Sequence, residues 1–352
     1  MSGVAPARRL SLAVVCLAAL AACVPRLQPA GPIERQPMLA ADRIIAHDNV
    51  ALPLRVWLPD GAARAVFVAL HGFNDYSNAF AAPAAYWRDR DIATYAFDQR
   101  GFGATPYRGE WAGAGPMTRD VRDAVALVRA RHPGAPVYLL GVSMGGAVAM
   151  LAAAGAAGSP AVRPAGGAAP PLAAGPPPLA VDGLVLVAPA VWGRSTMPLS
   201  YRVALWLGAH TLPWSTVSGR GLKILPSDNI DMLRALSADP LVIKETRIGT
   251  IDGLVDLMDD ALAASDRVTL PVLVLYGARD EIIPKAPTRR MLAAMPTNAR
   301  KVAVYDDGYH MLLRDLQAEI VHRDIAAWAR DPGAALPSDA DRNGDALFAE
   351  EE

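Results

Sequence analysis

Five residues, Gly141-Val142-Ser143-Met144-Gly145, constrain the fold of this chain more than any other stretch. The apolar segment 136–140 before them favours a β-strand, and the alanine-rich segment 146–154 after them favours a helix. A β-carbon two residues before or after the serine would crowd a tight turn, so the two glycines predict a sharp strand-to-helix turn. Such a turn holds the serine in a strained conformation with its hydroxyl exposed above a sheet. The pattern therefore predicts a nucleophilic serine at position 143.

An acid and a base that could activate this serine follow later in the chain. A serine hydroxyl is a poor nucleophile at neutral pH, so it needs a base to accept its proton and an acid to orient that base. The apolar segment 272–276 leads through Gly277 to Asp280, and the segment 301–305 leads into a loop that ends at His310. Both segments are expected to be strands. We therefore predict that Ser143, Asp280 and His310 are catalytic.

Other residues compete for these roles but occupy less suitable positions. His310 is favoured as the base because it alone follows a core strand late in the chain, and Asp280 as the acid because it combines a strand, a glycine turn and the right position. The histidine alternatives are His322, expected to be solvated on a helix, His132 at a helix end, His47 before the first turn, and His210. The acid alternatives are Glu281, Asp306 and Asp307.

The oxyanion that forms during acyl transfer needs backbone N–H donors. Met144 offers one amide at the start of the helix that follows the serine. The second is expected from the loop after strand 65–70, where Leu70-His71-Gly72-Phe73 lies, and we assign it to the amide of Phe73. His71 is interpreted as a residue that holds this loop in shape.

Continuous apolar strands alternate with helical segments through most of the chain, which predicts an α/β fold with a mostly parallel sheet covered by helices on both faces. We place this core at residues 41–190 and 265–330, beginning with a hairpin over 43–58. The Ala/Gly/Pro-rich segment 155–180 is expected to be a flexible insertion. Residues 191–264 lie between two core strands and are expected to form a helical cap or lid. Its aromatic residues, Trp192, Tyr201, Trp206 and Trp214, are expected to be mainly buried inside the cap.

The N-terminus is typical of an export signal. A positive pair, Arg8-Arg9, precedes an apolar run from Leu10 to Ala22 that is too short to span a bilayer. The run ends in Leu20-Ala21-Ala22-Cys23, which resembles the lipobox of bacterial lipoproteins. That resemblance implies a signal peptide over 1–22, lipidation of Cys23, a tether over 23–40, and a cell-envelope location, in the outer membrane if the organism has one. An ordinary secretory signal with an incidental cysteine is the alternative.

Composition excludes several other roles. The formal net charge of −1 gives no electrostatic reason to expect a nucleic-acid partner. Both cysteines lie within the first 23 residues, so the body of the chain has neither a disulfide nor a cysteine-ligated metal.

The acidic tail over 331–352 is expected to be disordered, and one pattern inside it resembles a calcium-binding loop. Its oxygen ligands would be Asp339, Asp341, Asn343 and Glu350, with Gly344 at the sixth position. Ala346 replaces the usual branched aliphatic residue, and no helix is expected on either side. A loop without flanking helices should bind calcium weakly, so this is a weak candidate.

Together these motifs resemble one known family. Leu70-His71-Gly72-Phe73, Asp98-Gln99-Arg100-Gly101, the turn at Ser143, Gly277-Ala278-Arg279-Asp280 and Gly308-Tyr309-His310 are similar to the monoacylglycerol lipase and lysophospholipase branch of the α/β-hydrolases, of the serine aminopeptidase S33 type. The chain departs from it in its 155–180 insertion, its lipobox, its acidic tail and Gln99, where many relatives have histidine.

The resemblance implies a serine carboxylic-ester hydrolase with a small lipid or ester substrate, expected to be a single-chain acyl lipid, monoacylglycerol or lysophospholipid. The expected reaction passes through an acyl-enzyme without a cofactor, under a cap that shapes an acyl-binding channel. A general carboxylesterase, a perhydrolase, a prolyl aminopeptidase and a non-catalytic envelope lipid-binding protein remain alternatives. The oligomeric state is open.

Overall fold

The computed structural model describes residues 27–29, 31, 34–156, 177, 179–221, 223–342 and 344–349. The predicted signal peptide, Cys23, most of the 155–180 insertion, Asn343 and Glu350 lie outside the described residues. Within the described part, none of the helices has the length and apolar character needed to cross a membrane.

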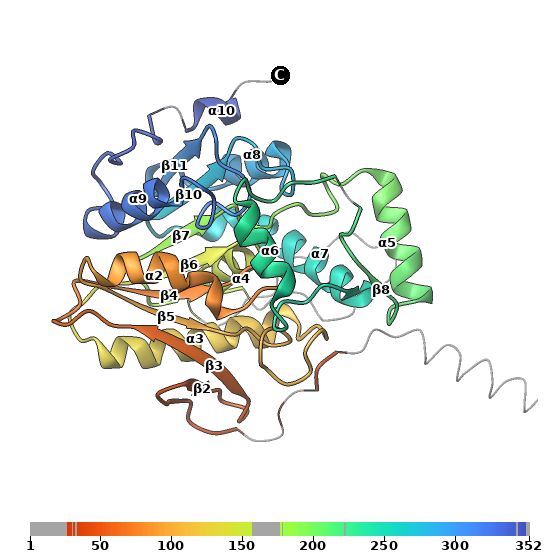
Figure 1. The fold of residues 1–352 in the computed structure, drawn as a ribbon, viewed down its shortest axis with the longest axis horizontal. Helices are drawn as coiled ribbons and strands as arrows, with labels where there is room; N and C mark the ends of the chain where they lie inside the picture. The colour runs from red at the N-terminus through yellow and green to blue at the C-terminus, as the bar shows by residue number, and fades with distance from the viewer. Residues whose placement is uncertain are drawn as a thin grey trace, which may run out of the picture.

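A nine-stranded sheet forms the centre of the molecule, in the order β1-β2-β3-β5-β4-β6-β7-β10-β11 (Figure 1). The first three strands pair in antiparallel fashion, β3 is antiparallel to β5, and all later pairs are parallel. This confirms the predicted mostly parallel α/β fold and the hairpin over 43–58. The strands are β1 (Met38–Leu39), β2 (Arg43–Ile45), β3 (Ala51–Trp57), β4 (Ala65–Leu70), β5 (Ile92–Phe97), β6 (Val137–Val142), β7 (Gly183–Val187), β10 (Val272–Gly277) and β11 (Arg300–Tyr305).

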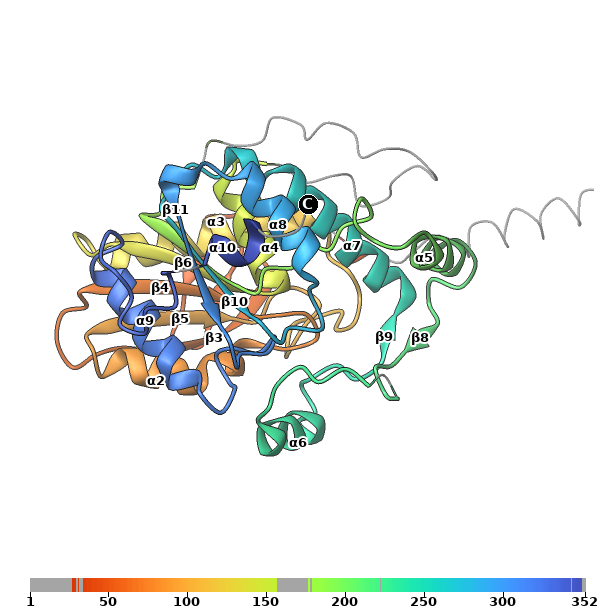
Figure 2. The same cartoon turned by 90° about the horizontal axis from the view of Figure 1, so that it is seen from above.

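Helices cover both faces of this sheet because both faces are apolar. Side chains alternate along a strand, so Val66, Val68 and Leu70 of β4 join one buried cluster, and Phe67 and Ala69 join a second on the opposite face. Helices on the first face are α3 (Ala114–Arg131), α4 (Met144–Ala153), α7 (Ile248–Ala263) and α8 (Lys285–Ala294); on the second they are α2 (Ala81–Arg88) and α9 (Ala318–Arg330) (Figure 2).

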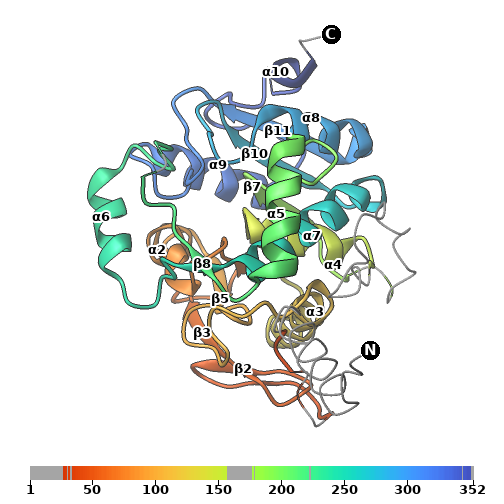
Figure 3. The same cartoon turned by 90° about the vertical axis from the view of Figure 1, so that its right-hand side faces the viewer.

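The insertion between β7 and β10 divides into two parts. One part stands away from the sheet and contains α5 (Leu199–Thr211), α6 (Ile230–Ala238) and a small ladder of β8 (Thr216–Val217) with β9 (Thr246–Arg247) (Figures 2 and 3). The other part, α7, buries Val255, Leu257 and Ala261 in the same cluster as α4. The cap expected over 191–264 therefore ends before α7, whose apolar face makes it a layer of the core.

The expectation that the cap aromatics are mainly buried is wrong for three of them. Tyr201, Trp206 and Trp214 are 57%, 45% and 50% exposed. Helix α5 has apolar residues around most of its circumference, and α7 covers one side of it. The remaining apolar side chains of α5 therefore face outward.

The C-terminal segment, defined here as the described residues from 331 to 349, also differs from expectation. Composition predicted a disordered tail, whereas Leu336 and Phe348 are 2% and 6% exposed. The amide of Val304 on the edge strand β11 donates to Ala340 O at 3.0 Å. The segment is ordered because it covers the edge strand and buries two large apolar side chains. The acidic composition alone could not predict these contacts.

Candidate active site

The turn at Ser143 has the geometry that its two glycines predict. Ser143 has φ 50° and ψ −115°, a strained combination for a residue with a side chain. A β-carbon on Gly141 would collide with the carbonyl of Gly145, and one on Gly145 would collide with Leu70 O. The Ser143 amide donates to Val187 O at 2.9 Å, which fixes the turn to the neighbouring strand. The half-buried serine is thus held at the end of β6 and the start of α4.

The acid and the base lie at the same edge of the sheet as the serine. Strands β6, β7, β10 and β11 are consecutive and parallel, so their carboxyl ends lie together. Asp280 follows β10 and His310 follows β11. The Nδ1 atom of His310 lies 2.8 Å from Asp280 Oδ2, and both side chains are buried.

Backbone amides orient the acid. Asp280 Oδ1 accepts hydrogen bonds from the amides of Ile282 at 2.8 Å and Ile283 at 3.0 Å. These bonds leave Oδ2 for the histidine. Because a carboxylate accepts, Nδ1 of His310 carries the proton, and Nε2 is the basic nitrogen.

The loop after β4 lies beside Ser143, as the oxyanion assignment requires. A β-carbon on Gly72 would be 3.5 Å from Ser143 Cβ. Within the described residues, no acceptor takes the amide of Phe73 or of Met144. The ring of Phe73 packs edge-on against Phe102 at 5.5 Å, which fixes the backbone of the loop. Two free donors therefore lie close to the serine.

His71 is enclosed behind this loop and is not a base. It is fully buried, and burial lowers its pKa. Its Nε2 accepts from the amide of Gln99 at 2.9 Å, so Nδ1 is the protonated nitrogen and donates to Gly72 O at 2.8 Å. Gln99 Nε2 donates to His71 O at 2.8 Å. His71 thus joins the loop to the end of β5, in agreement with the sequence interpretation.

Four residues that the sequence analysis did not select connect the loops of the site. Arg314, four residues after His310, forms a mostly buried ion pair with Asp75 of the loop after β4, which we call the oxyanion loop. Asn74 donates to Thr246 Oγ1 at 2.7 Å, and its carbonyl accepts from the Ile243 amide at 2.9 Å. Tyr76 donates to Asp239 Oδ2 at 2.7 Å. The oxyanion loop therefore contacts both the loop that carries His310 and the cap. In the sequence, these four residues are marked only by their proximity to the motifs.

The alternative histidines have other partners. His322 is buried, its Nε2 lies 3.0 Å from Leu313 O, and burial lowers its pKa, so the expectation of a solvated residue was wrong. The reason is that the buried face of α9 includes position 322. His132 ends α3 and bonds Tyr95 OH, His210 lies on exposed α5, and His47 bonds Asp123.

The alternative acids also lie outside the pair. Asp306 is exposed, and Asp307 pairs with Arg279. Glu281 accepts from the amide of Leu225 at 3.0 Å, which connects the acid loop to the cap.

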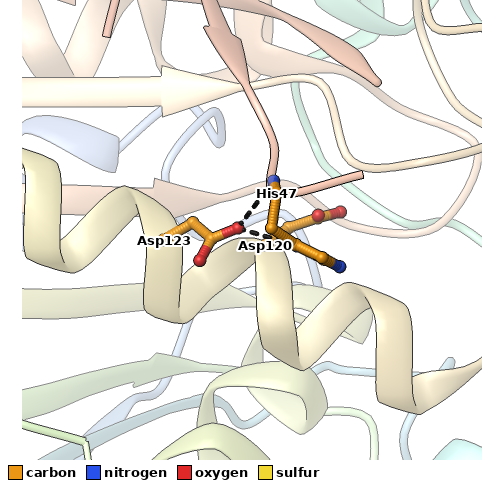
Figure 4. A group of neighbouring side chains, drawn as sticks. All are labelled: His47, Asp120 and Asp123. Carbon is orange, nitrogen blue, oxygen red and sulfur yellow. Dashed lines mark hydrogen bonds and ion pairs between the residues drawn. The ribbon is translucent and has the colours of Figure 1, made fainter. Parts of the chain in front are cut away.

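One cluster has the residue types of a metal site. In the described part of the chain, His47, Asp120 and Asp123 bring three potential ligand atoms within 4.8 Å of one another (Figure 4). Both oxygens of Asp120 accept from Arg100, at 2.6 and 2.7 Å, and Asp123 Oδ2 accepts from His47. Arg100 already balances the charge of Asp120, and His47 and Asp123 bond each other, so we interpret the cluster as the anchor of the hairpin on α3.

The described half of the calcium-like loop also has partners within the chain. Asp341 accepts from Lys301 Nζ at 3.0 Å and from the amide of Leu336 at 3.2 Å. Asp339 pairs with Arg342 at 3.1 Å. Asp341 thus fastens the C-terminal segment to β11, and Asp339 pairs within the segment.

A strained serine between a strand and a helix, at the carboxyl edge of a mainly parallel sheet, is the hallmark of the α/β-hydrolases, and this chain is one of them. Residues 61–317 match the model of the family described as serine aminopeptidase, S33. The chain belongs to that family and is a hydrolase of the esterase and lipase kind.

Its relatives include several monoglyceride lipases. The chain is 25% identical over 285 residues to the monoacylglycerol lipase of Mycolicibacterium smegmatis, which spans 80% of this chain and 93% of that protein. It is 25% identical over 278 residues to the monoglyceride lipase of Mus musculus, spanning 78% and 84%. These identities place the chain near this branch of the family.

Solved structures share the fold. The monoacylglycerol lipase of Paleococcus ferrophilus superimposes with a TM-score of 0.61 at 22% identity, over 79% of this chain and 98% of that one. A soluble variant of the monoglyceride lipase of Saccharomyces cerevisiae gives a TM-score of 0.63 at 17% identity, over 87% and 95%.

Proposed function

We propose that this hydrolase cleaves the carboxylic ester of single-chain acyl lipids, monoacylglycerol or lysophospholipid, through an acyl-enzyme. The observation that carries the proposal is the buried His310–Asp280 hydrogen bond at the sheet edge that also bears the strained Ser143. Several relatives are named as monoglyceride or monoacylglycerol lipases, which supports the substrate class.

Each group has one role in this reaction. Ser143 Oγ attacks the ester carbonyl while His310 Nε2 takes its proton, and Asp280 stabilises the imidazolium. The amides of Phe73 and Met144 hold the oxyanion of the tetrahedral intermediate. His310 then returns the proton to the departing glycerol or glycerophosphoryl oxygen, which leaves the acyl chain on Ser143. Water, activated by the same histidine, releases the fatty acid.

The exposed apolar cap supports a substrate held in a lipid surface. Leu199, Tyr201 and Trp206 of α5 are 69%, 57% and 45% exposed, and Trp214 after it is 50% exposed. Large apolar patches on a protein surface mark interaction sites. We further propose that Cys23 carries lipid and anchors the enzyme at the cell envelope, so that substrate and enzyme share one membrane.

Replacing the serine tests the proposal directly. Ser143→Ala should lower kcat/KM for monoacylglycerol by at least about a thousandfold, because the nucleophile is lost, while the fold is retained. It should also abolish labelling by a fluorophosphonate probe. Ser237→Ala, an exposed serine on α6, serves as the matched control.

A substrate panel separates the remaining alternatives. Monoacylglycerol, lysophospholipid, short p-nitrophenyl esters and a prolyl amide are compared at equal active-site concentration. Preference for the prolyl amide would replace the lipase proposal by an aminopeptidase, and full activity of Ser143→Ala would refute the catalytic assignment itself.

A further inference from the structure

The C-terminal segment reaches the strand that bears the catalytic acid. Its last helix, α10 (Ala346–Ala349), carries Phe348, whose ring packs edge-on against Tyr276 with centroids 5.3 Å apart. Tyr276 is the penultimate residue of β10 and is 1% exposed. Phe348 therefore covers a buried ring four positions before Asp280.

Tyr276 in turn contacts the acid loop. Its hydroxyl donates to Ile283 O at 2.8 Å, across the turn that contains Asp280. The amide of the same Ile283 donates to Asp280 Oδ1, and Asp280 Oδ2 bonds His310. A contiguous series of contacts thus leads from Phe348 through Tyr276 and Ile283 to the acid and the base.

The segment is fastened to the edge strand by several independent contacts. Gly344 approaches β11 so closely that a β-carbon would collide with Val302 O. Arg300 donates to Asp345 at 3.0 Å, and Lys301 donates to Asp341 at 3.0 Å. The segment therefore has a defined position, although residues 331–349 lie beyond the 61–317 region that matches the family.

The segment bridges a hollow where it passes α9. A cavity of about 730 Å³ lies there, lined by Val304, Ile320, Val321, Ala340 and Leu347. The amide of Ser338 donates to Asp324 of α9 beside this hollow, so a chain that ends at Arg342 keeps this contact and loses the contact of Phe348 with Tyr276.

We propose that the C-terminal segment holds the acid loop in its catalytic geometry, with Phe348 and Tyr276 as positioning residues for Asp280. The inference rests on the proposed function, since it assigns Asp280 and His310 the roles given above. Without the Phe348 ring, Tyr276 gains room to shift, Ile283 follows its hydroxyl, and the Asp280 carboxylate loses its fixed orientation toward His310.

The test compares Phe348→Ala, Tyr276→Phe and a chain that ends at Arg342, each scaled to fluorophosphonate-titrated active sites. A misplacement of this kind is expected to lower kcat about tenfold while KM stays within about twofold. A weaker Asp280 contact stabilises the imidazolium less, so the acid limb of the kcat/KM profile should move to lower pH. Asp315, a carboxylate beside the loop that carries His310, accepts from the Tyr309 amide and is unchanged in all variants.

Two controls separate positioning from simple loss of stability. Leu347→Ala removes a similar apolar side chain from the same helix and should leave the acid limb in place. Phe348→Leu keeps most of the apolar volume and should restore kcat; it also keeps the test decisive if Phe348→Ala does not fold.

An unchanged acid limb and unchanged kcat per titrated site in Tyr276→Phe and Phe348→Ala would overturn the inference. A loss of total activity in proportion to the loss of active sites that react with fluorophosphonate would also overturn the inference. Either result leaves the proposed function standing as long as Ser143→Ala is inactive, whereas an active Ser143→Ala would refute both.

Discussion

At the scale of single residues, the strained serine and its two glycines are the part of the site most completely set by local sequence. The carbonyl of Gly145 and the carbonyl of Leu70 leave no space for β-carbons at Gly141 and Gly145. These contacts lie within one turn or on the adjacent strand, so spacing alone predicts them. Asp280 and His310 were predicted instead from their order in the chain and their positions after expected strands.

His322 shows where residue-level prediction fails. Charged neighbours, Arg323 and Asp324, suggested a solvated helix face, yet Asp324 is fully buried. Its carboxylate accepts from Tyr305 OH at 2.9 Å and from the amide of Ser338 at 3.1 Å. Those partners come from β11 and from the C-terminal segment, and nothing near position 324 indicates them.

The buried His322 predicts a pH-dependent stability. Burial lowers its pKa in the folded state, so below the unfolded value of about 6.5 the unfolded chain binds a proton that the folded chain does not. This histidine therefore costs stability as the pH falls below 6.5, by up to about 1.4 kcal/mol per pH unit until its folded pKa is reached. In urea titrations, His322→Asn should lose less stability between pH 7.5 and 5.5 than the parent chain. His210→Asn, on exposed α5, is the control, and an equal loss in all three chains would contradict the prediction.

At the scale of elements, contacts between loops set the relative position of Phe73 and His310, the proposed oxyanion donor and base. The Asp75–Arg314 ion pair joins the loop after β4 to the loop after β11, which are separated by β6, β7 and β10 in the sheet. Sequence reasoning located both loops but missed the pair, because two isolated charges 239 positions apart give no local pattern. The folded sheet sets which loops lie next to each other, so local sequence does not reveal this pair.

A double-mutant cycle measures the coupling free energy between Asp75 and Arg314. Asp75→Asn and Arg314→Met should each destabilise the fold by about 3 kcal/mol, since each leaves an unpaired, mostly buried charge or polar group. The double variant should lose less than the sum, with a coupling of about 1–3 kcal/mol. Stability is read by urea unfolding and site geometry by fluorophosphonate labelling rate. Additive losses would show that the pair does not couple the loops.

At the scale of the whole molecule, the first described residues pack on Trp111, which lies against α7. Leu27 forms a parallel bridge with Trp111, and Gln28 donates to Glu110 O at 2.8 Å. Trp111 lies directly against Gly253 of α7, and α7 packs against α5. Leu27 and Gln28 fall within the tether expected over 23–40, and both are docked on the domain.

The docked tether and the exposed cap together predict how the enzyme would meet a bilayer if Cys23 carries lipid, as proposed. Leu27 lies four positions after Cys23, a span of at most about 14 Å, so a lipid on Cys23 would hold the Trp111 region close to the membrane. In the full-length chain reconstituted in vesicles, brominated lipids should quench a large share of the tryptophan emission, and Trp206→Phe with Trp214→Phe should remove most of that quenching. Both tryptophans are about half exposed, whereas Trp87 and Trp328 are fully buried.

Lipidation and orientation are distinguished by a second variant. Cys23→Ser should no longer incorporate labelled palmitate in cells and should bind vesicles at least about tenfold more weakly, because one apolar patch anchors less firmly than acyl chains do. Palmitate on the parent chain with no change in quenching in the Trp206→Phe, Trp214→Phe chain would mean that the anchor forms but a different face meets the bilayer. Palmitate incorporation by Cys23→Ser, or by neither chain, would refute the anchor, since Cys23 is the cysteine that follows the apolar run and the only other one, Cys16, lies within it.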